Sequence, residues 1–275
     1  MTARVRAFAK LNLSLRVVGR REDGYHEILS DVQTIDLADR IEIELRGASL
    51  RVENDLPLSG PDIAERAAAT LLEHKHVASG VSIRISKGIP AGAGLGGGSS
   101  DAAAVLATLD RLTPPRLPFE RLCSLGAGIG SDVPLFLHGG RVRMGGRGER
   151  VLRRSGTPVW FALVVPPVHC DTASVYARWD ARSGDAGTGE PALGENDLLE
   201  PALEAHPELI PYHEAVASVG GVYQGMSGSG STFYAAFDDP QAAERARLEL
   251  SERFGDAAAF VCRPTALGHN GGERP

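Results

Sequence analysis

A glycine-rich run at residues 89–106, IPAGAGLGGGSSDAAAVL, is the stretch whose residue types point most directly to chemistry. Glycine permits positive φ and has no Cβ, so a ligand can approach the backbone N–H groups. A helix is predicted to follow, and its first turn presents unpaired N–H donors and the positive end of its dipole, with a Ser99 or Ser100 hydroxyl available as a cap. The run therefore predicts a phosphate cradle rather than a loop whose glycines only allow close packing. The predicted phosphate-binding residues are Pro90, Gly92, Gly94, Leu95, Gly96, Gly97, Gly98, Ser99 and Ser100.

Two other phosphate-binding motifs compare less well with this run. A P-loop requires Lys followed by Ser or Thr after the last glycine, whereas Gly98 is followed by two serines. The spacing Gly92-x-Gly94-x-x-Gly97 matches the dinucleotide fingerprint, but that motif also needs a second parallel strand ending in an acid about 20 residues later. Residues 113–118 read TPPRLP and a helical pattern follows, so a dinucleotide-dependent oxidoreductase is retained only as an alternative.

Lys10 and Asn12 are predicted to face the same space. Residues 5–17 alternate between apolar and polar side chains, which is typical of a long, half-buried strand. The polar face of this strand carries Phe8, Lys10, Asn12 and Ser14. A lysine there can neutralise charge that develops during group transfer, and the alternative is a solvated strand lysine.

Asp132 lies in GIGSDVPLFL, residues 128–137, where a turn is predicted to lead into a short apolar helix. Transfer of a phosphoryl group to an alcohol needs positioning, charge neutralisation and an acceptor for the hydroxyl proton. Asp132 could accept that proton, and a neighbouring Lys10 would keep the carboxylate ionised and steady the charge on the attacking oxygen. The alternative is an ordinary N-cap aspartate.

The remaining pattern predicts an α+β protein of two lobes that divide near residue 155. Before that point, the expected strands are residues 32–37, 41–45 and 81–85, and the expected helices are residues 62–75, 99–112 and one that begins near Pro118. After it, the expected elements are a strand at 158–165, a helix at 173–179, a glycine-rich loop at 183–195, helices up to Val219, two strands flanking SGSGS, a helix at 241–254 and a strand at 257–263. The second set predicts an antiparallel sheet, and residues 268–275 resemble a frayed tail.

Composition and charge argue against several classes of protein. A chain of 275 residues with a net charge of −6 is large enough for a substantial core, and its acidic balance argues against general binding of nucleic acid or anionic membranes. Cys123, Cys170 and Cys262 have no metal-ligand spacing and are odd in number, so buried reduced thiols are expected. No signal-peptide or membrane-spanning pattern is evident, so we expect a cytoplasmic protein that is a monomer or a weak homodimer.

A basic run occurs late in the first predicted lobe. It consists of Arg141, Arg143, Arg147 and Arg150. We interpret these residues as solubilising side chains at a strand edge rather than as a flank for a bound diphosphate.

The sequence resembles the GHMP kinases, which use ATP to phosphorylate hydroxyl groups of small molecules. The resemblance rests on three motifs in order: AFAKLNLSL at residues 7–15, the glycine run with its Gly-Leu-Gly-Gly-Gly-Ser-Ser core, and GMSGSGSTF at residues 225–233. Further stretches narrow it to the branch whose substrate is a cytidine-diphosphate-linked methylerythritol, namely REDGYHEI at 21–28, GSDVPLF at 130–136, DTASVY at 171–176 and ENDL at 195–198.

The resemblance implies a fold, a reaction and its cofactors. The implied fold has a ribosomal-S5-like α/β lobe at residues 1–155, which holds ATP and the catalytic residues, and a ferredoxin-like α+β lobe at 156–275. The implied reaction is ATP-dependent phosphorylation of the 2-hydroxyl of the cytidylyl substrate, in the non-mevalonate route to isoprenoid precursors. A GHMP kinase for another alcohol, such as mevalonate or homoserine, and a relative that binds ligand without turnover are the alternatives.

The resemblance also implies roles for individual residues, with Lys10 and Asp132 as the catalytic pair. The other matches are Tyr25, His26 and Tyr176 for the cytidine, and Asn12, Thr172 and Gly228 for the rest of the substrate. Without the family, Gly-Tyr-His is more typical of a surface turn. Where the family has an asparagine that contacts adenine, this chain has Asp62, which lacks the amide donor. ATP transfer should require Mg²⁺, for which the Ser100 hydroxyl is a candidate ligand without a clear carboxylate partner.

Overall fold

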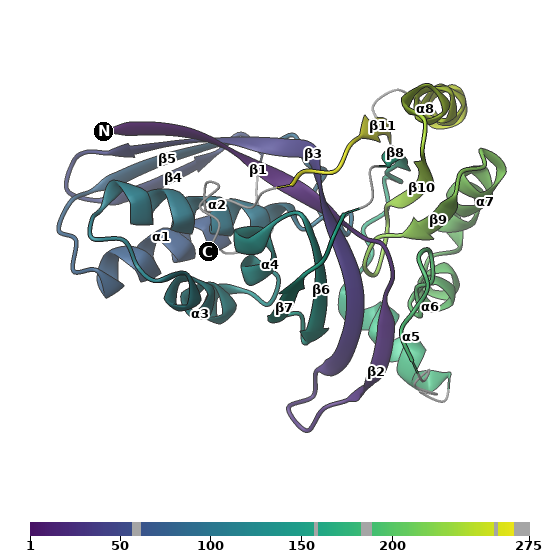
Figure 1. Ribbon diagram of the computed structural model, residues 1–275, viewed down its shortest axis with the longest axis horizontal. Helices are drawn as coiled ribbons and strands as arrows, with labels where there is room; N and C mark the ends of the chain where they lie inside the picture. The colour runs from purple at the N-terminus through teal and green to yellow at the C-terminus, as the bar shows by residue number, and fades with distance from the viewer. Residues whose placement is uncertain (57–61, 157–158, 183–188, 256–257, 267–275) are drawn as a thin grey trace.

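Two β-sheets, each with its own set of helices, make up the fold (Figure 1). The computed structural model describes residues 1–56, 62–156, 159–182, 189–255 and 258–266. The larger sheet has seven strands in the order β4-β5-β3-β6-β7, with β1 and β2 also paired to β3. Its strands are β1 (Thr2–Asn12), β2 (Arg16–Arg20), β3 (His26–Leu45), β4 (Leu50–Asn54), β5 (Val81–Ser86), β6 (Arg141–Gly146) and β7 (Arg150–Arg153). Its pairings are antiparallel except that of β4 with β5.

The strand β3 is longer than the sequence pattern indicates. Instead of two separate strands within residues 32–45, the structure has one continuous strand of 20 residues, which pairs with β1, β2, β5 and β6. Residues 38–40, between the two predicted strands, do not end it, because they pair in register with β1. A bulge just before them takes up residues 36 and 37: Phe8 pairs with Ala38, whereas Ala9 pairs with Ile35. β3 is therefore the strand along which the other strands of this lobe are aligned.

Four helices cover one face of the larger sheet (Figure 1). They are α1 (Ile63–His74), α2 (Gly97–Leu112), α3 (Phe119–Ile129) and α4 (Val133–His138). The helices predicted at 62–75, at 99–112 and near Pro118 are confirmed within a few residues at each end. The helix α2 packs against α1, α4, β1 and β3, and residues 100–110 are buried without a break. The small side chains of its alanine-rich sequence let neighbours approach it from several sides.

The smaller sheet has four antiparallel strands in the order β11-β8-β10-β9, which confirms the predicted antiparallel arrangement. Its strands are β8 (Trp160–Val164), β9 (Tyr223–Met226), β10 (Phe233–Phe237) and β11 (Ala259–Cys262). Its helices are α5 (Thr172–Ala181), α6 (Leu199–Ala205), α7 (Ile210–Ser218) and α8 (Pro240–Phe254), with a short 3-10 turn at Pro207–Leu209. Of the predicted loop at 183–195, residues 183–188 lie outside the described residues, as does the predicted tail at 268–275.

The sheet topology does not fit a dinucleotide-binding fold. That fold places its glycine run between two parallel strands that are joined through a helix. Here β5 precedes the run and is hydrogen-bonded to β4 and β3, both of which come earlier in the chain. The helix α2 therefore does not return to a parallel neighbour of β5, and the oxidoreductase alternative loses its structural basis. None of the described helices is both long and apolar enough to cross a lipid bilayer.

The strand β1 is buried on both faces where the two sheets meet. Its apolar residues join a core shared with the smaller sheet, where the Tyr234 hydroxyl donates to the carbonyl oxygen of Asn12 over 3.0 Å. Its polar residues Lys10 and Asn12, and Ser14 just beyond its end, are at most 6% exposed. The prediction of a half-buried strand is therefore wrong here, because the glycine run and the smaller lobe cover the face that alternation alone would leave to solvent.

Two ionic clusters are buried against α2, one near each end of the helix. Near its beginning, Nζ of Lys87 lies 2.5 Å from Oδ2 of Asp39 and 2.7 Å from Oδ2 of Asp101. Near its end, Nζ of Lys75 lies 2.9 Å from Oδ1 of Asp110. Burial, followed by the charge of Asp39, raises the pKa of Asp101 from 3.8 to about 8.

Replacing Asp101 with asparagine is expected to reduce the pH dependence of stability. Between pH 3.8 and about 8 the unfolded chain loses the Asp101 proton while the folded protein keeps it, so the native free energy of unfolding falls as pH rises through this window. Asparagine does not ionise in either state and still offers Lys87 an acceptor. Urea unfolding at about pH 5 and about pH 8 should show a larger loss of stability in the native protein than in Asp101→Asn. Parallel losses would contradict the raised pKa.

Candidate active site

A pocket of about 940 Å³ between the two lobes gathers most of the predicted site. The larger lobe contributes the end of β1, the turn after β2, the glycine run and the beginning of α4, and the smaller lobe contributes α5 and the turn between β9 and β10. The predicted residues that line the pocket are Lys10, Asn12, Tyr25, His26, Gly94, Gly96, Ser99, Asp132, Thr172, Tyr176 and Gly228. The predicted residues that do not line it are Asp62, Pro90, Gly92, Leu95, Gly97, Gly98 and Ser100.

The glycine run turns sharply before α2. Gly92, Gly94 and Gly96 have φ values of 68°, 75° and 72°, a region in which other residues are strained. Gly96 is the N-cap of α2, and no side chain caps the helix, so the prediction of a serine cap is wrong. The helix begins at Gly97, ahead of both serines, and its first N–H groups are not capped by a hydroxyl.

A second glycine-rich turn, residues 227–231 between β9 and β10, packs directly on the glycine run. A Cβ at Gly94 would lie 2.3 Å from the carbonyl oxygen of Ser227. The Ser227 hydroxyl donates to the carbonyl of Gly94 over 2.9 Å, and the Thr232 hydroxyl donates to the carbonyl of Ala93 over 2.7 Å. Close packing therefore accounts for the glycine at position 94, and it fixes the run from the side of the smaller lobe.

The Ser100 hydroxyl does not face the pocket, which corrects its prediction as a phosphate and metal ligand. Ser100 is fully buried, and its Oγ donates to the carbonyl oxygen of Phe8 over 2.6 Å. Ser99, one position earlier on the helix, is the serine that lines the pocket. Among the described residues, no group of three or more His, Cys, Asp and Glu side chains is arranged to hold a metal ion.

The Lys10 ammonium is buried and is held by Asn12. Its Nζ donates to Oδ1 of Asn12, whose Nδ2 donates to the Ser30 hydroxyl over 2.8 Å. A Cβ at Gly228 would lie 3.3 Å from Nζ, so the second glycine-rich turn approaches the ammonium closely. Burial lowers the pKa of Lys10 from 10.5 to about 8, and the charge of Asp132 partly opposes this effect. The alternative of a solvated strand lysine is wrong.

Asp132 stands at the beginning of α4 without capping it. Its side chain makes no capping hydrogen bond, so the N-cap alternative does not explain this residue. It lines the pocket, and its charge acts on groups from two other elements. It favours the ammonium form of Lys10 on β1, and it adds to the effect of burial in raising the pKa of Tyr176 on α5. A carboxylate placed beside a buried ammonium in an accessible pocket can accept a proton from a bound hydroxyl.

Aromatic side chains form the outer wall of the pocket. His26 and Tyr176 stack on each other with their ring centroids 4.5 Å apart, so a planar ligand does not fit between them. Nε2 of His26 lies 2.8 Å from Oδ1 of Asp180, and Trp179 meets the imidazole edge-on. Tyr25, in contrast, is 57% exposed. Its ring is the aromatic surface in the pocket that a ligand can reach most readily.

The basic run divides into residues with different surroundings. Nη2 of Arg141 and Nε of Arg143 lie 3.0 Å and 2.7 Å from Asp31, and both arginine side chains are at most 14% exposed. The interpretation as strand-edge solubility is wrong for these two, because β3 pairs alongside β6 and places Asp31 opposite them. Arg147 lines the pocket, with its guanidinium carbon 4.9 Å from the centroid of the Tyr25 ring. No feature of the sequence distinguishes Arg147, which lines the pocket, from the other arginines of the run, which do not.

The ENDL and DTASVY motifs hold the second glycine-rich turn. Nδ2 of Asn196 donates to the carbonyl oxygens of Met226 and Gly228, both over 2.8 Å. Oγ1 of Thr172 lies 3.0 Å from Oγ of Ser229. Sequence reasoning assigned Asn196 no role, although its motif was the available signal. It acts by fixing the backbone that approaches Lys10.

Asp62 lies outside the pocket and has two protein partners. One carboxylate oxygen accepts from the backbone N–H of Ala64 over 2.8 Å, which makes Asp62 the N-cap of α1. The other accepts from Nδ2 of Asn54 over 2.5 Å. A capping role therefore accounts for the aspartate, and its contact with adenine stays a prediction.

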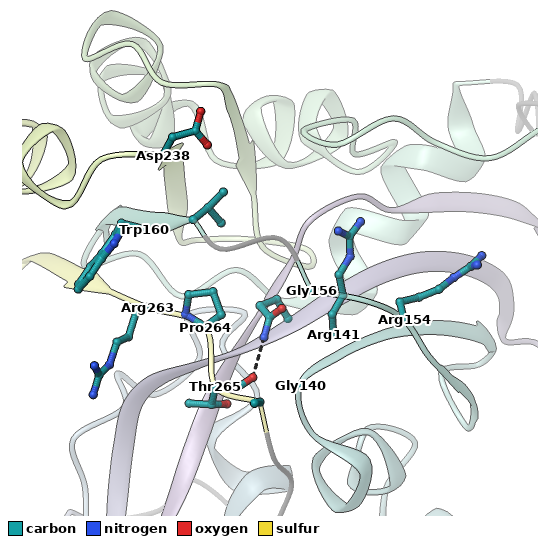
Figure 2. Close-up of a pocket in the computed structure, with 12 residues that line it drawn as sticks. Gly140, Arg141, Arg154, Gly156, Trp160, Asp238, Arg263, Pro264 and Thr265 are labelled. Atoms are coloured by element: carbon teal, nitrogen blue, oxygen red, sulfur yellow. Dashed lines mark hydrogen bonds between the residues drawn. The ribbon is translucent and has the colours of Figure 1, made fainter.

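A second pocket, of about 590 Å³, lies where the connections between the two sheets meet (Figure 2). Gln33 lines it and donates from Nε2 to the carbonyl oxygen of Thr265 over 3.0 Å. The three arginines that line it, Arg141, Arg154 and Arg263, each have an acidic partner, at 3.0, 3.8 and 3.1 Å. Their charge is balanced locally, and the lining contains neither the glycine run nor the lysine–aspartate pair. The inter-lobe pocket with Lys10 and Asp132 is therefore the better candidate for chemistry.

Comparisons with known proteins agree with this geometry. Residues 62–140 match the GHMP kinases N terminal domain, and residues 177–256 match the GHMP kinases C terminal domain. A 4-diphosphocytidyl-2-C-methyl-D-erythritol kinase from Solibacter usitatus is 37% identical, with 91% of this chain and 86% of the relative covered. Its counterpart from Thiobacillus denitrificans is 39% identical, with 93% of this chain and 92% of the relative covered.

Solved structures give the same result. A crystal structure of 4-(cytidine 5'-diphospho)-2C-methyl-D-erythritol kinase superposes with a TM-score of 0.83 at 35% identity, covering 96% of this chain and 100% of the other. A mevalonate kinase shares the fold with a TM-score of 0.67 at 14% identity, covering 96% of this chain and 99% of the other. The two lobes, the pocket between them and near-complete coverage by relatives of one name place this chain in the GHMP kinases, among the 4-diphosphocytidyl-2-C-methyl-D-erythritol kinases.

Proposed function

We propose that this protein transfers the γ-phosphoryl group of ATP to the 2-hydroxyl of 4-diphosphocytidyl-2-C-methyl-D-erythritol, a step in the non-mevalonate formation of isoprenoid precursors. The observation that carries the proposal is the meeting of Lys10 and Asp132 with the glycine run in one pocket. Residues 1–155 supply the nucleotide cradle and the catalytic pair. Residues 156–275 supply Thr172, Tyr176 and the second glycine-rich turn.

The phosphates of ATP bind at the glycine run and the beginning of α2. Gly94, Gly96 and Ser99 line the pocket there, and the first turn of α2 directs N–H groups toward it without a side-chain cap. ATP reaches the site as its magnesium complex, with the metal held mainly by the phosphates, because Mg²⁺ in such sites keeps several non-protein ligands. The adenine lies toward the beginning of α1, where Asp62 stands in place of the family's asparagine.

Asp132 accepts the proton of the substrate hydroxyl as the oxygen attacks the γ-phosphorus. Burial lowers the pKa of Lys10 to about 8, so Lys10 remains protonated below that pH and its ammonium offsets negative charge on the attacking oxygen. Asn12 holds the ammonium in position from one side, and Gly228 leaves it room from the other. The pair therefore combines proton acceptance with charge stabilisation at one place.

The cytidine of the substrate stacks on Tyr25. This ring is exposed in the pocket, whereas His26 and Tyr176 are already stacked on each other and form the wall beside it. The guanidinium of Arg147 lies over the same ring and supplies a cation for the diphosphate. A cytidine diphosphate thus finds an aromatic surface and a positive charge side by side. Cys123, Cys170 and Cys262 are free thiols, which is consistent with a protein that acts in the reducing cytoplasm.

ADP release with Mg-ATP tests the proposal. The purified protein is offered 4-diphosphocytidyl-2-C-methyl-D-erythritol, mevalonate, homoserine and galactose in parallel. Turnover confined to the first substrate supports the proposed reaction. Turnover with mevalonate or homoserine instead would assign the protein to another alcohol, and ATP binding without turnover on any of them would indicate a ligand-binding relative.

The substitution Tyr25→Ala is expected to weaken binding of the cytidylyl substrate without weakening binding of ATP. Loss of one base–aromatic stack corresponds to 1–3 kcal/mol, so KM for this substrate should rise about tenfold while KM for ATP stays within about twofold. Initial-rate kinetics with each substrate varied in turn measure both constants. An equal rise in both KM values would show that the base binds elsewhere. Tyr25→Phe keeps the ring and serves as the control with a near-native KM.

A further inference from the structure

A buried ionic cluster lies directly beneath the glycine run. It consists of Lys87 after β5, Asp39 on β3 and Asp101 on α2. The three side chains are at most 8% exposed, and the lysine bridges the two carboxylates at 2.5 Å and 2.7 Å. None of the three lines the inter-lobe pocket. The cluster therefore contacts the loop from outside the pocket.

The cluster holds both the beginning and the end of the glycine run. At the beginning, Oδ1 of Asp39 accepts hydrogen bonds from the backbone N–H groups of Gly88 and Ile89, over 2.6 Å and 2.8 Å. At the end, Asp101 belongs to the second turn of α2, and Nζ of Lys87 lies 3.5 Å from the Cβ position of Gly97, the first residue of the helix. The two ends of the loop are thus joined through one lysine rather than through direct contact alone.

Further support of the loop comes from β1, where the backbone N–H of Lys10 donates to the carbonyl oxygen of Leu95 over 3.0 Å, and from the smaller lobe. Ser227 and Thr232 donate to the carbonyl oxygens of Gly94 and Ala93 in the middle of the run. Between residues 92 and 98 the run contributes no polar side chain that could fix its N–H groups, because these residues are glycine, alanine and leucine. Its geometry therefore depends on these external supports, at its middle and at its ends.

Stability alone does not explain such a cluster. Removing charges from water is costly, and buried ion pairs replaced by apolar residues of similar volume are often neutral or stabilising. Here one ammonium faces two acidic side chains, and burial together with the charge of Asp39 keeps Asp101 protonated below about pH 8 because its pKa is raised. A cluster of this kind under a flexible, ligand-binding loop is better explained by the precise position that it imposes on the backbone.

We propose that Lys87, Asp39 and Asp101 are positioning residues that hold the glycine run in the conformation that binds the phosphates of ATP. The inference rests on the proposed function only in assigning ATP to this loop. Breaking the cluster lets the loop ends move, so the N–H groups must be ordered again when the nucleotide binds. The cost falls on nucleotide affinity, because the Lys10 ammonium keeps its hydrogen bond to Asn12 and Asp132 stands at the beginning of α4, which the cluster does not hold.

The test uses direct binding of a non-hydrolysable ATP analogue, the β,γ-imido compound with Mg²⁺, measured by calorimetry on the purified protein. Asp101→Leu removes one of the two acceptors of Lys87, the one on α2, and should weaken binding of the analogue about tenfold or more. Asp101→Asn keeps an acceptor there, and its affinity should stay within about threefold of native. In turnover, Asp101→Leu should raise KM for ATP, with kcat at saturating ATP and KM for the cytidylyl substrate near native.

The matched control is the second buried pair on the same helix. Asp110→Leu breaks the contact with Lys75 at the other end of α2. It should lower the melting temperature of the protein without weakening binding of the analogue. A purely structural role would make the two leucine variants alike. If Asp101→Leu does not fold, Asp39→Asn replaces it, because this change sets an amide N–H₂ or a weaker acceptor against Lys87 while leaving the volume unchanged.

The outcomes separate this inference from the proposed function. Native analogue affinity in folded Asp101→Leu or Asp39→Asn, or equal weakening in Asp110→Leu, overturns the positioning role. Weaker binding in the cluster variants together with no turnover of the cytidylyl substrate by the native protein would leave the positioning role standing and reject the proposed reaction. A native protein that does not bind the analogue would overturn both.

Discussion

The substitution Asp132→Asn is expected to lower kcat by at least about a hundredfold and to leave both KM values within about threefold. The amide cannot accept the proton of the substrate hydroxyl, and removal of the carboxylate also removes the charge that supports the Lys10 ammonium. Ground-state binding changes little, because aspartate and asparagine have the same shape. Steady-state ADP release with each substrate varied separately measures the effect.

The fold should not change in Asp132→Asn, so a change in kcat can be assigned to the lost carboxylate. The Asp132 side chain makes no capping hydrogen bond to α4, so the amide replaces no contact within the helix. Asp239→Asn is a suitable control, because Asp239 caps α8 away from the pocket and asparagine is an equally good cap. Near-native kcat in Asp132→Asn would remove Asp132 from the role of proton acceptor.

The substitution Lys10→Met is expected to reduce kcat by about a hundredfold or more. Methionine fills the buried site but carries no charge, so nothing at this position offsets the negative charge of Asp132 or of the attacking oxygen. Stability should also fall by about 1–3 kcal/mol, because Oδ1 of Asn12 loses its donor in a buried position. Kinetics at saturating substrates measures the change in kcat, and urea unfolding measures the change in stability.

The pH profile provides a second readout for Lys10. Burial lowers its pKa to about 8, so the native ammonium loses its proton as pH rises through that value, and kcat should fall on the alkaline side. Lys10→Met has no such proton, so its residual kcat should lack this alkaline fall. Lys75→Met, which removes another buried lysine, should keep kcat within about threefold and retain the native profile. An unchanged alkaline fall in Lys10→Met would assign the titration to another group.

The sequence by itself determined the parts of this protein that depend on neighbouring residues. The glycine run followed by a helix predicted α2 in outline, though with a serine cap that the structure lacks, because glycine content and helix formation are local properties. Alternation along residues 5–17 placed Lys10 and Asn12 on one face, and the structure joins them by a hydrogen bond. The order of strands and helices after residue 155 predicted the antiparallel sheet of the smaller lobe.

Only the tertiary structure decided which of these side chains are available for chemistry. The same alternation that paired Lys10 with Asn12 predicted solvent on that face, whereas the smaller lobe and the glycine run bury it and lower the pKa of the lysine. Spacing could not separate Ser99 from Ser100, yet one lines the pocket and the other donates to Phe8.

The basic run shows the same limit. Arg141 and Arg143 lie against Asp31 because β6 pairs with β3, while Arg147, in the turn beyond β6, meets Tyr25 in the pocket. Local sequence sets backbone conformation and the face on which a side chain lies. Burial, charge partners and pKa depend on segments a hundred or more residues away, because they follow from which strands pair and which lobe covers them.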